Sequence, residues 1–205
     1  MELTDKQIRN NRIKLLILWL VPFGLMAIAA IVYGLVMQGK LSLGSTNQGD
    51  LIQPPKQMAE IALYDEAGEL TTGAFDGKWT MLIRSDASCN EDCMATLHLT
   101  RQIHIRLDKN ANRVQRIYLS AAPQLDQQLA EHIGKEHRYL RTLHASAAQL
   151  SDITAYLAEL PPSTGRQPFV LVDPQGWAMM TYSANHDGNA ILEDLKHLLK
   201  FPRES

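Results

Sequence analysis

The residues of this chain that are best suited to chemistry are its only two cysteines, Cys89 and Cys93. They follow an apolar run, Trp79–Ile83, and precede apolar residues at helical spacing, so we expect them at a strand-to-helix turn. Backbone N–H groups at a helix start favour a thiolate, which is both the nucleophile of disulfide exchange and a ligand for soft metals. A small structural disulfide remains the alternative, because residues four apart lie roughly 5–6 Å apart there.

Composition limits the classes of protein that are compatible with the chain. Its 205 residues, 45% hydrophobic content and formal net charge of −2 suit one well-packed domain with an appendage. No basic stripe with interleaved aromatic residues occurs, so we expect no nucleic-acid partner. Two cysteines are too few for a disulfide scaffold or a four-ligand structural zinc site.

The N-terminal region predicts a membrane anchor. Residues 1–14 are polar and include four Lys or Arg residues, whereas residues 15–37 carry no charge. A helix over that apolar stretch exceeds the roughly 30 Å hydrocarbon core of a bilayer. A cleaved signal normally has a shorter apolar region, and a buried soluble helix would not be apolar on all sides. We therefore expect a single membrane span, with residues 1–14 in the cytoplasm and the C-terminal domain outside it, in a periplasm-like space.

The rest of the chain predicts an α/β domain. Residues 38–58, rich in Gly, Ser and Pro, are expected to form a linker, and residues 59–205 the folded domain. The order strand 79–83, helix 93–107 and strand 114–120 predicts a βαβ unit with parallel strands. The other expected elements are two short strands within 61–70, helices at 122–134, 148–160 and 191–199, a strand at 139–143, and a hairpin of strands 168–173 and 177–182.

Together these features resemble the thioredoxin fold, a central mixed sheet flanked by helices. Pro168 opens the hairpin eight residues before Gly176, which is similar to the spacing from the cis-proline to the hairpin glycine of that fold. The resemblance implies that Pro168 is cis, faces the cysteines and leaves the neighbouring backbone free to pair with a substrate peptide.

Three residues between the cysteines make the chain more similar to the Sco/SenC family. These are membrane-anchored thioredoxin-fold proteins that deliver copper to, or reduce cysteines of, the binuclear copper centre of cytochrome c oxidase. The segments 47–55, 77–79 and 113–118 look like those of a proteobacterial group of such proteins, and this resemblance implies a bacterial inner membrane with the C-terminal domain in the periplasm. Two features depart from the family pattern: Met94 stands where a proline is usual, and Gly165 where the histidine ligand is expected.

The departures leave an incomplete copper site. Two thiolates can still hold Cu(I), a soft ion that tolerates low coordination, but would hold Cu(II) poorly. His186 follows the hairpin and is expected near the cysteines, so we consider it a candidate metal ligand or proton partner, with a solvated loop histidine as the alternative. The histidines at 132, 137, 144 and 197 are interpreted as surface or half-buried residues.

The family resemblance implies a function in cytochrome c oxidase assembly, by thiol-disulfide exchange or by Cu(I) delivery. In exchange, Cys89 would attack and Cys93 would resolve the mixed disulfide, with Pro168 as the third site residue. The expected partner is an oxidase subunit or another periplasmic thiol protein, and the resemblance implies an assembly factor rather than an enzyme, with a thiol-disulfide oxidoreductase as the alternative. The alternative is a non-catalytic scaffold whose disulfide is structural. A peroxidase of the peroxiredoxin kind is a third possibility, but it needs a threonine or serine and an arginine around a lone nucleophilic cysteine. The sequence around Cys89 does not show that pattern.

Overall fold

The structure is a computed structural model that describes residues 5–37, 47–75, 77–85, 88–159, 169–182 and 186–200. The chain divides into two compact units, Met1–Thr46 and Asn47–Ser205. Pro168 and Gly165 lie outside the described residues, as does Asp86 beside the cysteines. The expected cis conformation of Pro168 therefore stays a prediction.

The first unit contains one long helix, α1, over Asp5–Met37. Within it, Lys14–Leu35 has a mean hydropathy of 2.7, and no part of its most apolar window is buried by the rest of the chain. These 22 residues extend about 33 Å, which is enough to cross a hydrocarbon core. The helix predicted for residues 15–37 is confirmed, and by length and composition it is a candidate membrane span.

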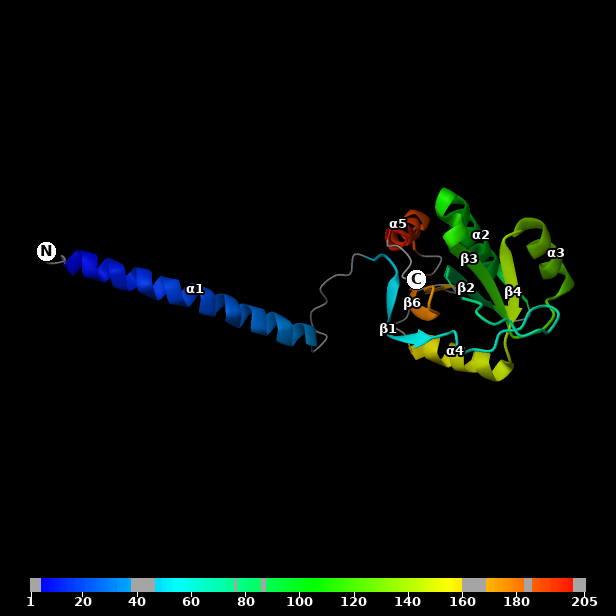
Figure 1. Cartoon of the computed structure of the whole chain (residues 1–205), viewed down its shortest axis with the longest axis horizontal. Helices are drawn as coiled ribbons and strands as arrows, with labels where there is room; N and C mark the ends of the chain where they lie inside the picture. Colours follow the sequence, from blue (N-terminus) through cyan, green and yellow to red (C-terminus); the bar gives the residue numbers. More distant parts are fainter. Residues whose placement is uncertain are drawn as a thin grey trace. The chain divides into compact units, whose positions relative to one another are not determined.

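The second unit is organised around a six-stranded mixed sheet with the order β1-β6-β5-β2-β3-β4 (Figure 1). β2 pairs in parallel with β3, and β3 with β4, whereas β5 pairs antiparallel with β2 and β6, and β6 antiparallel with β1. This arrangement confirms the expected βαβ unit and hairpin. The strand bounds are β1 Asp50–Gln57, β2 Trp79–Ser85, β3 Val114–Ser120, β4 Leu140–His144, β5 Phe169–Val172 and β6 Trp177–Tyr182.

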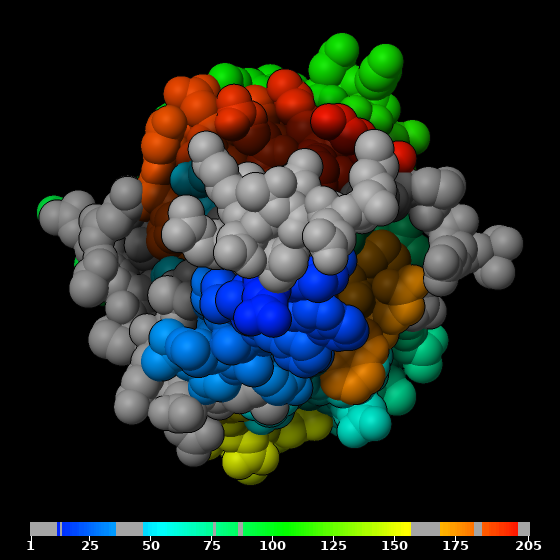
Figure 2. All heavy atoms as spheres, turned by 90° about the vertical axis from the view of Figure 1, so that its left-hand side faces the viewer, coloured from blue at the N-terminus to red at the C-terminus, as the bar shows by residue number. Residues whose placement is uncertain are grey.

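Helices cover both faces of the sheet, as in a layered α/β domain. The core on one face includes side chains of α2 (Glu91–Arg106), α3 (Gln127–Glu136) and α5 (Gly188–Leu198). The core on the other face includes α4 (Ala147–Glu159) and the segment between β1 and β2. Figures 1 and 2 both show α5, in orange to red, and α4, in yellow, on opposite sides of this unit. A short 3-10 helix, Asp108–Arg113, joins α2 to β3.

Three expectations from the sequence are corrected by the structure. Residues 50–57, assigned to the linker, form β1; this strand lies at the sheet edge, and its register shifts between Leu51 and Lys56, where two prolines can be accommodated. The two strands expected within residues 61–70 reduce to isolated bridges of Tyr64 with Leu70 and with His144. α3 begins at Gln127 rather than at residue 122, because Asp126 Oδ1 accepts the Leu129 N–H at 2.8 Å and caps the helix there.

Candidate redox site

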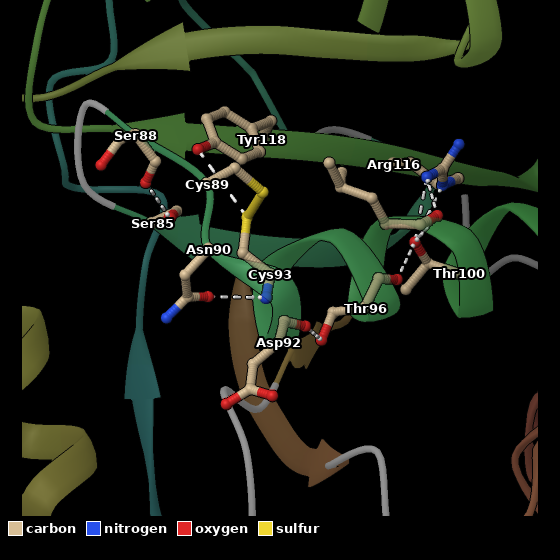
Figure 3. The surroundings of a disulfide bond; sticks show 11 residues. Ser85, Ser88, Cys89, Asn90, Asp92, Cys93, Thr96, Thr100, Arg116 and Tyr118 are labelled. Atoms are coloured by element: carbon tan, nitrogen blue, oxygen red, sulfur yellow. Dashed lines mark hydrogen bonds between the residues drawn. A yellow bond between two sulfur atoms is a disulfide. The ribbon is translucent and has the colours of Figure 1, made fainter. Parts of the chain in front are cut away.

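Cys89 and Cys93 are joined by a disulfide at the turn from β2 into α2 (Figure 3). Their Cα atoms are 5.2 Å apart. The turn ends at Asn90, which is the N-cap of α2, since its Oδ1 accepts the Cys93 N–H at 2.9 Å. The predicted strand-to-helix position of the pair is therefore confirmed, and the cap fixes Cys93 in the first turn of the helix.

The two sulfur atoms have different access to solvent. Cys93 is 0% exposed and belongs to the core between the sheet, α2 and α5. Cys89 is only partly buried, and its neighbour Ser88 is exposed. An incoming thiolate can therefore approach Cys89 but not Cys93. This asymmetry is what a dithiol exchange site needs, because one sulfur must meet the target and the other must remain protected.

Two acidic residues occupy the first turn of α2. Glu91 is exposed and Asp92 half-buried. Negative charge at a helix N-terminus interacts favourably with the helix dipole, so both residues stabilise the start of α2. The Asp92 carbonyl also accepts the Thr96 hydroxyl at 3.0 Å, which adds a side-chain bond to this turn.

β3 supplies two buried polar side chains, Tyr118 beside the cysteine pair and Arg116 beside Thr100 further along α2 (Figure 3). The Tyr118 hydroxyl lies 4.0 Å from Cys93 Sγ, and Tyr118 is 0% exposed. Arg116, two residues earlier on the same strand, donates to the Leu97 carbonyl at 2.8 Å and to Thr100 Oγ1 at 3.0 Å. Both acceptors belong to α2, so Arg116 ties the helix that carries Cys93 to the central sheet.

Arg116 is a buried cation without a carboxylate partner among the described residues. Only 1% of it is exposed. Burial, and to a lesser extent the nearby charge of Arg101, lower the pKa of Arg116 to about 10, so it remains charged at neutral pH. Arg116 therefore places a fixed positive charge on the buried side of α2, beside Leu97 and Thr100.

His186 does not complete a metal site within the described residues. Its Nε2 lies 3.8 Å from Asp50 Oδ2, and its ring centroid is 5.6 Å from that of Tyr182. In the part of the chain that the structure describes, no three His, Cys, Asp or Glu side chains are grouped so as to hold a metal ion. The structure thus brings Cys89 and Cys93 together, and ligation by His186 stays a prediction.

His137 differs from the expectation of a surface or half-buried histidine. It is 4% exposed, and Arg116 Nη2 lies 3.4 Å from its Nδ1. Because Arg116 can only donate, His137 accepts through Nδ1 and is neutral. Burial, followed by the charge of Arg116, lowers the pKa of His137 to about 4, in agreement with this role. The expectation is wrong here because the α3–β4 connection packs against the buried side of α2.

Asn90, Arg116 and Tyr118 were not identified from the sequence as parts of the site. Asn90 could have been recognised, because an asparagine directly before two acidic residues and a helical pattern is a normal N-cap signal. Arg116 and Tyr118 lie on a strand that is buried on both faces, so its residues show no alternation that would assign them to one face.

A solvent-accessible cysteine bonded to a buried one, at the start of the helix that follows a central strand of this sheet, defines a thioredoxin-fold protein with a redox-capable site. Residues 79–202 match the family described as transmembrane-like, thioredoxin-like, C-terminal domain. The chain belongs to this family. No curated protein sequence matches it significantly.

Solved structures of Sco proteins share the fold. Copper-bound ScoI of Arabidopsis thaliana is 21% identical with a TM-score of 0.55, covering 73% of this chain and 99% of that one. Apo Sco1 of Thermus thermophilus is 19% identical with a TM-score of 0.58, covering 77% and 99%. A thiol:disulfide interchange protein from a Bacteroides species is 15% identical with a TM-score of 0.50, covering 76% and 92%. These likenesses confirm the predicted Sco-like thioredoxin fold.

Proposed function

We propose that this protein is a membrane-anchored thiol-disulfide exchange protein of the Sco-like kind. The observation that carries the proposal is the pairing of a partly exposed Cys89 with a fully buried Cys93 at the N-terminus of α2. α1 serves as the anchor, with the N-terminus in the cytoplasm of a bacterium and the thioredoxin-like unit in the periplasm, where disulfides persist.

The geometry assigns separate roles to the two sulfur atoms. When the protein acts as an oxidant, a target thiolate attacks Cys89 Sγ and forms a mixed disulfide with it. The Cys89–Cys93 bond breaks, and its electron pair remains on Cys93 Sγ. A second target thiolate then attacks the target's sulfur in the mixed disulfide and releases Cys89. The target loses two electrons and two thiol protons, and the protein becomes the dithiol; the reverse sequence reduces a target disulfide.

The proposed biological role is assistance in cytochrome c oxidase assembly, through exchange with cysteines of the oxidase copper site or with another periplasmic thiol protein. Support comes from the fold shared with Sco proteins and from the membrane-span candidate. Delivery of Cu(I) is a second candidate, because solved neighbours of this fold contain copper and two thiolates suit a soft ion. The absence of a three-residue metal cluster among the described residues gives exchange the greater support.

A non-catalytic scaffold with a structural disulfide is the competing class of function. Reduction potential distinguishes it, because structural disulfides in exported proteins usually lie below about −300 mV. The test is equilibration of the intact, detergent-solubilised protein with glutathione and dithiothreitol buffers. A potential in the range of exchange-active dithiols supports the proposal, whereas a value below about −300 mV with no measurable exchange contradicts it.

Copper is tested separately by anaerobic Cu(I) titration of the reduced protein, with Cys89→Ser and Cys93→Ser variants beside it. Tight one-to-one binding that is lost in both variants would establish copper carriage. The His186→Ala variant is then decisive for that residue: an unchanged Cu(I) affinity removes it from the site. If no Cu(I) binds and exchange is retained, the protein is a thiol-disulfide exchanger without metal cargo.

A further inference from the structure

The contact between Tyr118 and Cys93 is the one polar side-chain contact to either sulfur that is described in the structure (Figure 3). In the oxidised protein Cys93 Sγ carries no hydrogen, so any hydrogen bond between the two atoms must be donated by the Tyr118 O–H. The hydroxyl is held in place by the strand pairing, because Tyr118 lies directly opposite Ile83, two residues from the end of β2. Its position therefore depends on the rigid centre of the sheet and not on the cysteine turn.

Opening of the disulfide creates a specific electrostatic problem at Cys93. The departing sulfur receives the electron pair of the S–S bond while Cys93 is 0% exposed and belongs to an apolar core that includes Leu97 and Ile191. Water cannot solvate it there, and an unpaired buried charge is costly. A donor that is already in contact with this atom reduces that cost at the moment when the charge develops.

We propose that Tyr118 is a catalytic residue of the exchange reaction, whose hydroxyl donates a hydrogen bond to Cys93 Sγ as that sulfur leaves Cys89. This inference rests on the proposed exchange function and deepens it. Attack of a thiolate on Cys89 forms one S–S bond and breaks the other. The electron pair stays on Cys93, and the Tyr118 proton is shared with that sulfur without being transferred.

The surroundings of Tyr118 suit a developing negative charge. Arg116 points to the same side of β3 as Tyr118, because residues two apart share a face of a strand. Its guanidinium is buried, bonded to the Leu97 carbonyl one helical turn beyond Cys93, and has no carboxylate partner in the described ranges. A charge on Cys93 thus forms on the same helix that this fixed positive charge contacts, and a positive charge at this helix favours a thiolate.

The test compares Tyr118→Phe with the wild type in the intact, detergent-solubilised protein. Two quantities are measured: the equilibrium constant for reduction of the disulfide by glutathione, and the rate at which glutathione thiolate opens the disulfide. Loss of a hydrogen bond to a charged atom should lower both by at least about tenfold, and a tenfold fall corresponds to about 30 mV more negative potential.

Tyr182→Phe is the matched control. Tyr182 is also 0% exposed and lies in the same core, but its hydroxyl donates to Asp194 Oδ2 at 2.9 Å. Its removal should lower stability and leave the exchange constants within about twofold of the wild type, because it gives no support to the leaving sulfur. Equal shifts in the Tyr118 and Tyr182 variants would mean a general effect of core disruption, and would overturn the inference.

Failure of the inference can be distinguished from failure of the proposed function. If the wild type exchanges readily and Tyr118→Phe has the same equilibrium constant and opening rate as the wild type, Tyr118 has no catalytic role. The proposed exchange function is then retained. A wild type without exchange overturns both. If Tyr118→Phe does not fold, 3-fluorotyrosine at position 118, a stronger donor, is measured at mildly acidic pH. A faster opening and a less negative potential support the inference, and unchanged values overturn it.

Discussion

Reduction of the Cys89–Cys93 disulfide should leave the protein folded, with only a small loss of stability. The sequence separation of the two cysteines is 4, so the bond closes a very short loop. Chain entropy predicts that such a loop stabilises the folded state by about 2 kcal/mol. The sheet and its two cores are built from long-range strand pairs that do not depend on this bond.

The stabilisation expected from the disulfide can be converted into a change in melting temperature. For a folded unit of the size of Asn47–Ser205, each 1 kcal/mol changes Tm by roughly 2–4 °C, so reduction should lower Tm by about 4–8 °C. The assay is thermal unfolding of the intact chain in detergent, followed by near-UV circular dichroism with and without a phosphine reductant. The doubly substituted Cys89→Ser, Cys93→Ser protein is the control for effects of the reductant itself.

The same experiment can refute the exchange mechanism. An exchange protein must exist in both redox states, so its reduced form has to retain the fold that presents Cys89. If reduction lowers Tm by more than about 15 °C, or removes the cooperative transition, the loop-entropy argument fails and the bond is structural. The scaffold hypothesis would then be preferred over exchange.

Three further predictions concern the framework of the site. Because the pKa of His137 falls from 6.5 to about 4 on folding, the unfolded chain binds more protons between these values. Urea unfolding should therefore show stability rising by up to about 3 kcal/mol from pH 4 to 6.5, and His137→Gln should flatten that rise. Asp194 accepts hydrogen bonds from two backbone N–H groups just before β1 and from the Tyr182 hydroxyl, and Asp194→Asn weakens all three. Hydrogen exchange should therefore show faster opening of β1, and the free energy of unfolding should fall by about 2–4 kcal/mol. Gly176→Ala places a Cβ 2.6 Å from Ala59 Cβ at a backbone φ of +87°. Denaturant titration should show a free energy of unfolding lower by about 1–3 kcal/mol, while Cys89 remains reactive.

The sequence predicts most of the sheet because its central strands are short apolar runs between turn residues. β3 and β6 have the predicted bounds, and β2 continues two residues beyond Ile83. β1 was missed because its Pro54-Pro55 pair normally argues against a strand. Only its partner β6, more than a hundred residues away, shows that β1 is an edge strand in which prolines are tolerated. That partner cannot be read from local sequence.

The candidate site was predictable only in part, for a related reason. Cys89 and Cys93 are recognised by residue type, spacing and position after a strand. Tyr118 comes to Cys93 only through the register of β3 on β2, which pairs it with Ile83. Arg116 contradicts the general expectation that arginine is exposed, and its burial depends on acceptors that α2 provides, including Thr100.

The burial of Cys93 also helps to distinguish thiol-disulfide exchange from copper transfer as the function of the site. Exchange needs an approach to one sulfur only, and Cys89 is partly exposed. Transfer of Cu(I) by ligand exchange needs an incoming ligand to reach a metal held by both sulfurs, one of which is 0% exposed beneath the helix start. A donor at Cys93, such as the Tyr118 hydroxyl, can stabilise a leaving thiolate, but it competes with a metal ion for the same sulfur lone pairs. This arrangement is therefore more compatible with thiol-disulfide exchange than with copper delivery. Any measurable affinity for Cu(I) should increase in Tyr118→Phe, while the rate of exchange falls.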